Sequence, residues 1–392
     1  MRTVSDDERR ARLAIRHALA PGFRVDSVEA AVEAMTCLHA TEQANVYLSA
    51  FARSDAPMKE VDRALYDDRT VVRQLAMRRT VFAFPRELLP AVRGSASARV
   101  AAQLAARLAK EVEANGLSDD GKAWVGRVCA DVVAELRREP ATTAELRTRL
   151  PELDRRLQMS PGKSYGGEFP VASRVLSTLA ADGVVVRGRQ EQGWKTARPY
   201  WTVVEQWLPD LPDPLDERSG YAELVRRWLW TFGPGTEDDL VWWLGATKGA
   251  VRTALAEVDA VEVRLDDGRT AWLRSDDEEQ PVAPPPWAVL LPALDPTTMG
   301  WKERGFYLGE HATAIFDRNG NAGPTAWWDG RIVGGWTQRD DGTVLVVPVG
   351  ELPPAALDAL QAEADRLTAW LDGDVVRSIY QSPLVRALAA DA

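Results

Sequence analysis

The sequence predicts a mainly α-helical α+β protein in which tandem winged-helix domains form a C-shaped array and precede a small β-rich C-terminal domain. Two patterns favour this fold. The order helix, helix, strand, turn, strand, which is typical of a winged helix, occurs between residues 142 and 204 and returns between 221 and 273. After residue 280, β-branched and aromatic runs predict short strands, which are followed by one closing helix.

Residues 1–139 are expected to form an N-terminal helical, winged-helix-like domain. Ser27 is placed as the N-cap of a helix whose apolar residues recur at three- and four-residue spacing as far as Leu38. The run Thr80–Phe84 is β-branched and aromatic and stops at Pro85, which predicts a short strand. Further helices are expected over residues 58–66, 71–77 and, with a break at Gly116, 95–136.

A basic winged helix is expected over residues 140–215. Thr142 and Glu145 form a capping-box pattern that opens a short helix. After a loop rich in Gly, Ser and Pro at 160–169, Pro170 should begin a second helix and Gly183 should end it. The wing then consists of two strands, Val184–Val186 and Trp194–Val204.

A second, acidic winged helix is expected over residues 216–280, with helices at 221–232, 236–245 and 247–258 and a hairpin at 261–273. The acidic run Ser275–Glu279 and the prolines Pro284–Pro286 then mark a boundary. The C-terminal β-rich domain occupies residues 281–392. Its expected strands cover 289–291, 313–316, 325–328, 332–337 and 343–347, and its closing helix covers 357–371.

Composition limits the class of protein. The chain is 45% hydrophobic and 27% charged, as is usual for a globular protein. No apolar run reaches the 18 residues of a membrane span, and the charged start Met1–Arg12 lacks an apolar signal core, so a cytoplasmic protein without a membrane partner is expected. Two cysteines and three histidines supply few metal ligands, and no metal site is expected.

The charges are distributed unevenly along the chain. Residues 1–200 hold 32 Lys and Arg against 26 Asp and Glu, whereas the second half is strongly acidic and brings the whole chain to −10. Within the basic half, residues 155–200 carry eight basic against three acidic side chains. A local excess of this kind favours contact with nucleic-acid phosphates, and double-stranded DNA is the expected partner.

Four segments carry a resemblance to a known family: Leu38–Arg53 (LHATEQANVYLSAFAR), Met77–Phe84 (MRRTVFAF), the winged helix Thr142–Trp201, and Leu290–Asp295 (LLPALD). In this order and spacing, the chain resembles the bacterial winged-helix DNA glycosylases of the AlkZ and YcaQ type. The resemblance implies an enzyme that excises bulky N-alkylated purines (N7 or N3 adducts, or crosslinks), in DNA repair or genotoxin resistance. It implies no metal or organic cofactor.

The family's catalytic motif is a Gln-x-Gln or Gln-x-Asp triplet upstream of a Leu-Ser-x-aromatic-Ala-Arg run. Matching that run to Leu48–Arg53 places the triplet on His39, Ala40 and Thr41, so that neither glutamine is present. An imidazole can accept a proton from water near neutral pH, which makes His39 the expected catalytic residue and Thr41 its hydrogen-bonding helper. A shift of two residues would use Thr41 and Gln43 instead, so Glu42 and Gln43 are reserve candidates.

Ordinary structural roles for these residues stay open. His39 follows the apolar face of the expected helix through Met35 and fits a core histidine, and Thr41 fits a helix terminator. Phosphate contacts are expected from six basic residues: Arg78, Arg79, Arg174, Arg187, Arg189 and Lys195. For Arg78 and Arg79 the alternative is a solvated charged face.

Two rival functions stay open, of which the first follows from the absence of the glutamines. One is a catalytically inactive winged-helix protein that binds DNA, for example as a regulator. The other is a protein that sequesters a small molecule. The chain is expected to be a monomer in each case.

Overall fold

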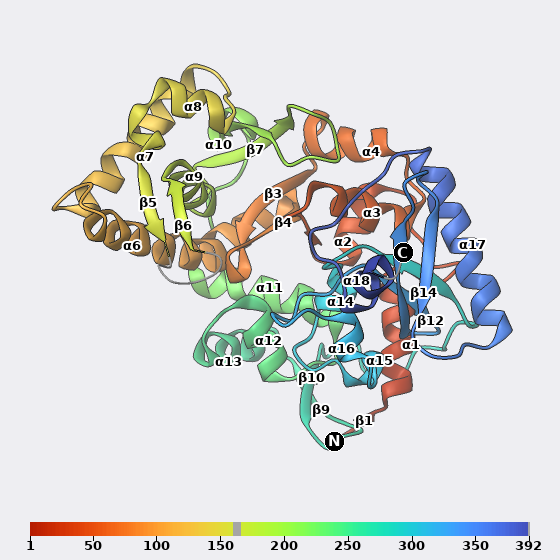
Figure 1. The fold of residues 1–392 in the computed structure, drawn as a ribbon. Coiled ribbons are helices and arrows are strands. Elements are labelled where there is room, and N and C mark those ends of the chain that lie inside the picture. The colour runs from red at the N-terminus through yellow and green to blue at the C-terminus, as the bar shows by residue number, and fades with distance from the viewer. Residues whose placement is uncertain (160–165, 391–392) are drawn as a thin grey trace. The chain divides into compact units, whose positions relative to one another are not determined.

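The computed structural model describes residues 1–159 and 166–390. The chain divides into two compact units: unit 1 holds residues 1–71, 83–85 and 222–392, and unit 2 holds residues 72–82 and 86–221. Figure 1 labels the elements along the chain. The chain passes between the units within β3 (Val71–Ala76), β4 (Thr80–Pro85) and α11 (Glu217–Phe232). The four-domain division expected from the sequence stays a prediction.

Unit 1 begins with helices α1 (Asp6–Arg16) and α2 (Val28–Ala34). Ser27 caps α2 as expected, since its side chain accepts the Ala30 N–H. The expected continuation of this helix to Leu38 is wrong, because the helix ends at Met35 and Thr36 takes a positive φ of 63°. The chain then forms a short strand, β2 (Leu38–His39), followed by helix α3 (Gln43–Ser54).

The next elements confirm one helix and overturn another. The helix expected over 58–66 is present as α4 (Met58–Asp62) and the π-helical turn that continues it. The helix expected over 71–77 is wrong, since these residues form strand β3. All six residues of β3 are buried, and a strand buried on both faces has no alternation that would distinguish it from a short helix. Strand β4 agrees with the expected Thr80–Phe84 strand.

Unit 2 contains a helical pair, α6 (Ala98–Ala114) and α7 (Gly121–Arg138), which confirms the helices expected over 95–136. Their contact requires a glycine at position 121, because a Cβ there would lie 2.1 Å from the carbonyl oxygen of Ala109. The preceding short helix α5 (Leu89–Val92) completes this part of the unit.

The two helices and the two-stranded hairpin expected here are present in unit 2, although the second strand begins at Pro199 rather than at Trp194. They are α8 (Thr143–Arg149), which carries the expected capping box, α9 (Ala172–Ala181), β7 (Val185–Gln190) and β8 (Pro199–Val203). The two wing strands pair antiparallel, with Val185 opposite Val203, and α10 (Val204–Trp207) follows.

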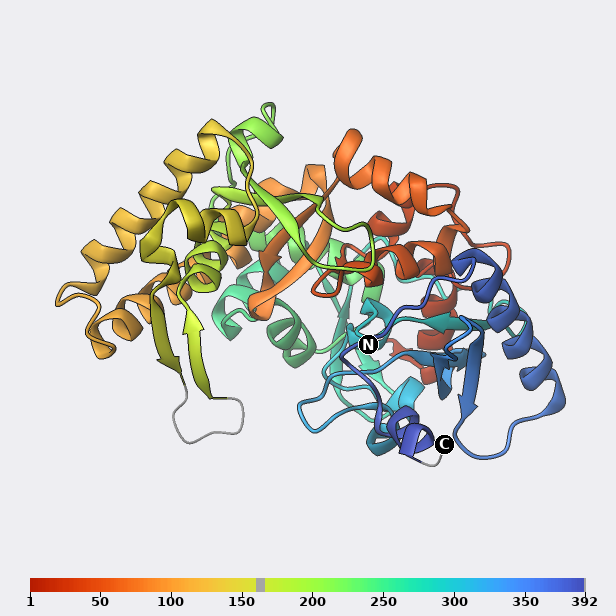
Figure 2. The ribbon, with the colours of Figure 1, turned by 45° about the horizontal axis from the view of Figure 1, so that its top comes forward.

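One hairpin of unit 2 was not expected. β5 (Arg156–Met159) pairs antiparallel with β6 (Gly167–Pro170), as Figure 2 shows. Part of the expected loop is therefore strand, and residues 160–165 lie outside the described residues. Pro170 ends β6 rather than beginning a helix, because α9 starts at Ala172.

The second set of helices and hairpin lies mainly in unit 1. It consists of α11, α12 (Glu237–Leu244), α13 (Lys248–Glu257), β9 (Val261–Leu265) and β10 (Thr270–Leu273), in the expected order. An N-terminal strand, β1 (Thr3–Val4), adds to β9 in parallel and was not expected. The three strands share a small core of Val4, Val263, Leu265, Ala271 and Leu273.

The C-terminal part of unit 1 is an antiparallel sheet of order β11-β12-β13-β14, formed by Ala288–Leu291, Thr325–Trp328, Arg331–Gln338 and Val344–Pro348. Helix α17 (Pro354–Leu371) packs on it as expected. The strand expected over 313–316 is wrong, because Ala312–Ile315 forms the short helix α16. Three further short helices, α14 (Pro296–Met299), α15 (Gly305–Leu308) and α18 (Pro383–Ala390), were not expected.

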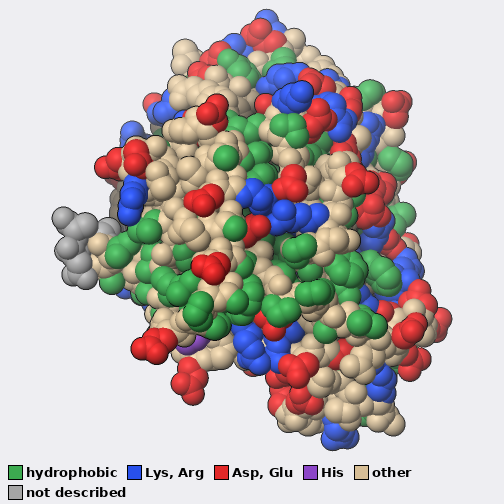
Figure 3. Space-filling view, turned by 90° about the vertical axis from the view of Figure 1, so that its right-hand side faces the viewer, with side chains coloured by type: hydrophobic (Ala, Val, Ile, Leu, Met, Phe, Trp, Pro, Cys, Tyr) green, Lys and Arg blue, Asp and Glu red, His purple; other side chains and the backbone are tan. Residues whose placement is uncertain are grey.

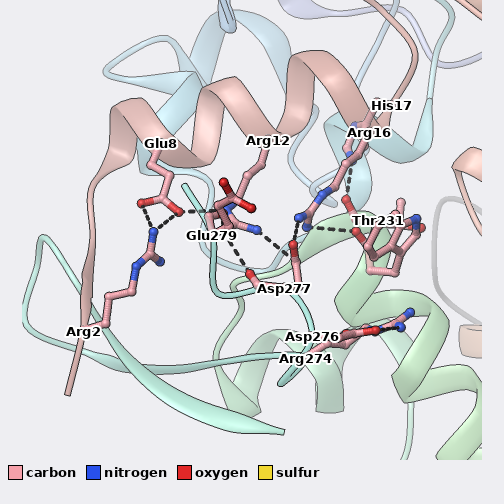
Figure 4. A network of polar contacts seen from close by, with 11 residues as sticks. Arg2, Glu8, Arg12, Arg16, His17, Thr231, Arg274, Asp276, Asp277 and Glu279 are labelled. Atoms are coloured by element: carbon pink, nitrogen blue, oxygen red, sulfur yellow. Dashed lines mark hydrogen bonds and ion pairs between the residues drawn. The ribbon is translucent and has the colours of Figure 1, made fainter. Parts of the chain in front are cut away.

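Asp277, in the middle of the acidic run Ser275–Glu279, is buried against α1, whereas the other four residues of the run are exposed (Figure 4). Arg12 donates from Nη1 to the Asp277 carboxylate at 2.9 Å and from Nη2 to the Glu279 carbonyl oxygen at 2.7 Å. Arg16 also pairs with Asp277. Part of the acid excess of the second half is therefore neutralised inside unit 1.

Acidic and basic side chains are interspersed over the face of the molecule that Figure 3 shows, with hydrophobic side chains between them. Within residues 1–159 and 166–390, no helix combines the length and the apolar character needed to cross a membrane.

Candidate catalytic segment and DNA-binding residues

The predicted catalytic triplet connects strand β2 to helix α3. His39 is the last residue of β2, and Thr41 lies in the bend before α3. His39 is 6% exposed, whereas Thr41 is exposed. Because α2 ends before this segment, His39 is not part of a helical core face. Its assignment as a catalytic residue stays a prediction.

Glu42, a reserve candidate, is held by the C-terminal segment of the chain. It is the N-cap residue of α3, but its side chain makes no capping hydrogen bond. Its carboxylate instead accepts the Ser378 hydroxyl and the Ile379 backbone N–H, each at 2.7 Å, and the Asn45 amide at 3.3 Å. The start of α3 is thereby tied to residues more than 330 positions away.

Gln43, the other reserve candidate, is buried in a polar group. Its Nε2 donates to the Tyr66 hydroxyl at 2.7 Å. Nearby, the Tyr47 hydroxyl donates to the Asp62 carboxylate at 2.5 Å, and burial, followed by the neighbouring Tyr66, raises the pKa of Tyr47. The Gln43 amide therefore has a structural role between α3 and the turn at Tyr66.

Helix α3, which follows the triplet, is fixed by a fully buried ion pair that the sequence patterns did not indicate. Arg53 donates to both carboxylate oxygens of Asp295, at 2.7 and 2.9 Å, and neither side chain is exposed. Ser49 donates to the same carboxylate at 2.7 Å. Burial acts to raise the pKa of Asp295, but the charge of Arg53 and the hydrogen bonds from Arg53, Ser49 and the Thr297 N–H outweigh it and lower the pKa, so the carboxylate is ionised.

His17 extends this network. Its Nδ1 lies 2.9 Å from the Thr297 hydroxyl, and its Nε2 lies 3.1 Å from the Thr231 carbonyl oxygen. Arg53 also donates to the Thr297 hydroxyl, at 2.9 Å. Burial, followed by the Arg53 charge, lowers the pKa of His17 to about 3, so this imidazole is neutral at pH 7. It serves the core rather than catalysis.

The three basic residues predicted to contact phosphates at the β7–β8 hairpin differ in their surroundings. The guanidinium of Arg187 lies 4.5 Å from the ring centroid of Trp201, and burial, followed by the charge of Arg73, lowers its pKa to about 9. Arg187 is therefore a packing residue of the β7–β8 hairpin. Arg189 and Lys195 are exposed beside it and can reach a ligand.

A second cationic group in unit 2 combines three elements. Arg174 of α9 lies 3.6 Å from Glu111, and Arg107 donates to the same carboxylate at 2.7 Å. Burial is the main cause that lowers the pKa of Arg174, and the charges of Arg107 and Arg79 act in the same direction. Arg79 and Arg174 are thus close in space, and Arg107 joins them although the sequence did not point to it.

The turn that carries Arg78 and Arg79 is strained. Both residues have a positive φ, of 55° and 61°, in the short turn between β3 and β4. A side chain in this conformation costs roughly 1 to 2 kcal/mol per residue relative to ordinary backbone. Such strain is common at functional sites. It presents the exposed Arg79 at the hairpin tip.

The parts of the chain that the structure describes contain no group of three or more His, Cys, Asp or Glu placed to hold a metal ion.

Fold and site together define a mixed α/β protein with several small sheets, a β7–β8 hairpin with exposed Arg189 and Lys195 beside it, and a short polar segment that opens a helix. The sequence model of the family described as DNA glycosylase AlkZ-like matches residues 32–370, and the chain belongs to this family. The structure is similar to that of the DNA glycosylase AlkZ from Streptomyces sahachiroi, with a TM-score of 0.75, 21% sequence identity, and coverage of 96% of this chain and 99% of that one. A search of curated proteins found no match.

Proposed function

We propose that this DNA glycosylase hydrolyses the N-glycosidic bond of bulky N-alkylated purines, in DNA repair or genotoxin resistance. The observation that carries the proposal is the family match over residues 32–370, which includes the triplet segment and both of its structural supports, α3 and Asp295. The two sets of helices and hairpin are interpreted as tandem winged helices.

The chemistry requires few groups. Alkylation at purine N7 leaves the base cationic, so the glycosidic bond is already weak. The enzyme needs only to stabilise the developing positive charge on the sugar and to supply a water to its anomeric carbon. A substrate of this kind needs no metal, and a side chain that accepts one proton from the water is sufficient.

His39 is the proposed acceptor of that proton, and Thr41 is proposed to help orient the water. The position between β2 and α3 supports this assignment, because the segment is fixed at both ends by regular structure. The buried His39 imidazole can be held in one orientation, while Thr41 is exposed to an incoming substrate. Glu42 and Gln43 are engaged with Ser378 and Tyr66, which favours His39 over both reserves.

Unit 2 is proposed to bind the phosphates of duplex DNA. The supporting observation is the placement of exposed Arg189 and Lys195 on the wing and of Arg79 beside Arg174. Contacts to phosphates give affinity without strong sequence preference, as a glycosylase that searches DNA requires. A cytoplasmic monomer is proposed for the working form.

The test is incubation with duplex DNA that contains N7-methylguanine, followed by measurement of the released base and the abasic sites. An enzyme releases base with turnover. A catalytically inactive DNA-binding protein gives only salt-dependent binding, and a protein that sequesters small molecules binds an alkylating compound without DNA. Either of the last two results would contradict the proposal.

A further inference from the structure

The C-terminal segment Asp374–Tyr380 has no helix or strand but is fixed at several points. Gln338, which is buried, donates to the carbonyl oxygen of Asp374 at 3.0 Å and accepts the Val376 N–H at 2.8 Å. Arg377 pairs with Asp340 at 2.6 Å. The next two residues are held by Glu42, whose carboxylate accepts hydrogen bonds from the Ser378 hydroxyl and the Ile379 N–H. The segment is therefore fixed beside the start of α3.

Within this fixed segment, Ile379 points into solvent. Its side chain is 80% exposed, whereas the side chain of its neighbour Tyr380 is half-buried. The backbone hydrogen bond holds this isoleucine with its side chain in water. Because its apolar surface is not buried, the side chain does not stabilise the fold. Its carboxylate partner, Glu42, directly follows Thr41 in the chain.

The pocket below this segment is too small to accept a base. It is lined among others by Asn45, Leu48, Trp336, Arg377 and Ser378, and its volume is about 30 Å³. This space suits roughly one water, whereas pockets for small organic ligands are about ten times larger. Thr41 and Ile379 are exposed on the outer surface of this part of unit 1, where a DNA duplex can contact them.

We propose that Ile379 is an apolar wedge that contacts the bases of the substrate DNA at the lesion, next to the His39–Thr41 triplet. Isoleucine is one of the side chains that proteins insert between base steps, where it separates stacked bases and is itself removed from water. Glu42 is then a positioning residue, because it fixes the wedge and the triplet to one carboxylate. The inference rests on the proposed function for the location of the triplet.

The experiment uses the full chain and a duplex with N7-methylguanine on a 2′-fluoro sugar, which slows loss of the base, and with 2-aminopurine as its neighbour. The variants are Ile379→Ala, Ile379→Leu and the control Val282→Ala, which shortens another apolar side chain that is 87% exposed. We expect wild type to raise 2-aminopurine fluorescence on binding, as the base unstacks. Ile379→Ala should abolish most of this rise and weaken binding about 5- to 50-fold.

Ile379→Leu should bind within about twofold of wild type because it keeps the apolar volume, and Val282→Ala should match wild type. Equal affinity and fluorescence for Ile379→Ala and wild type, or no fluorescence change with wild type, would overturn the wedge. Base release from the same sequence on a normal sugar is measured separately. Its absence in wild type would contradict the proposed function, while the binding comparison would still decide the role of Ile379.

Discussion

The Arg53 guanidinium and the Asp295 carboxylate form two hydrogen bonds, at 2.7 and 2.9 Å, with neither side chain exposed to solvent. The two residues are 242 positions apart and belong to two of the four segments that carried the family resemblance, Leu38–Arg53 and Leu290–Asp295. Their pairing fixes α3 to the loop after β11. The pair therefore helps to hold α3, the helix that directly follows the triplet segment.

Removing one partner of this pair should strongly destabilise the fold. Arg53→Met leaves the Asp295 charge buried without its counter-ion, and such a change typically costs about 3 to 5 kcal/mol. The free energy of unfolding from urea titration measures it. The double variant Arg53→Met with Asp295→Leu should recover part of the loss, because no buried charge remains.

A matched control for this prediction is the surface ion pair of Glu237 with Arg252, whose side chain is 66% exposed. Arg252→Met should unfold close to wild type, since exposed ion pairs contribute little. Equal stability of Arg53→Met and Arg252→Met would contradict the structural role of the buried pair.

His17 should make the fold less stable in acid. Its pKa is about 3 in the folded protein and near 6.5 in the unfolded chain, so the unfolded chain binds more protons between these values. The contribution of the neutral His17 to the free energy of unfolding is complete above pH 6.5. As the pH falls below this value, that contribution is lost by up to about 1.4 kcal/mol per pH unit. Unfolding measured between pH 7 and 4.5 tests this.

The control variant for that experiment is His17→Gln, which keeps a hydrogen-bonding side chain but does not titrate. Its stability should depend less steeply on pH in this window than that of wild type. The Asp295 carboxylate does not interfere, because its pKa is lowered from 3.8 and its protonation matters only below that value. Identical pH dependence in wild type and His17→Gln would contradict the assignment.

DNA binding should depend on the exposed cations of unit 2. If four to six phosphates are contacted, the slope of log K against log salt is roughly −4 to −5. The double variant Arg189→Gln with Lys195→Gln should flatten the slope by about 2. Affinity measured by fluorescence anisotropy between 50 and 300 mM salt provides the slopes.

The variant Arg187→Gln tests hairpin stability rather than phosphate contacts. Since its guanidinium packs on Trp201, Arg187→Gln should lower the stability of the β7–β8 hairpin more than it changes the salt slope. An unchanged slope in the Arg189 and Lys195 double variant, with the fold intact, would place the DNA-binding surface elsewhere. The cluster of Arg79, Arg107 and Arg174 would then be the next set to test.

Local patterns predicted much of the fold, because caps and hairpins depend on neighbouring residues. The caps at Ser27 and Thr142 and the β7–β8 wing are all present. Two of the errors occurred where short apolar runs lack a clear period. Val71–Ala76 is a fully buried strand, and Ala312–Ile315 is a helix of one turn.

The site could be predicted only where its residues are adjacent in the chain. The triplet at 39–41 is such a run, and the resemblance pointed to it. The contacts of Glu42 with Ser378 and of Arg53 with Asp295 join residues far apart in the sequence, and nothing in local spacing indicates them. The packing of Arg187 on Trp201 was missed for a related reason, since charge alone suggested an exposed side chain.

His39 should carry the catalytic step. A positioned general base contributes about 100- to 10,000-fold, so His39→Ala should lower the rate of base release by that order and leave DNA affinity nearly unchanged. Thr41→Ala should cost less, because a hydroxyl only helps to orient the water. Single-turnover rates and binding on the same duplex measure both quantities.

Full activity in His39→Ala would contradict this assignment. Glu42 and Gln43 would then be examined, although Glu42→Gln also weakens the contact with Ser378 and Ile379. Ser378→Ala is the matched control, because it removes one hydrogen bond from Glu42 and leaves the carboxylate in place.

The most direct measurement is the release of N7-methylguanine from duplex DNA by the wild-type protein, with an equal quantity of abasic sites. We predict multiple turnovers at neutral pH without added metal, and a rate at least about 100-fold lower for His39→Ala. No release of base by wild type from DNA with N7- or N3-alkylpurines, in the presence of measurable DNA binding, would contradict glycosylase function.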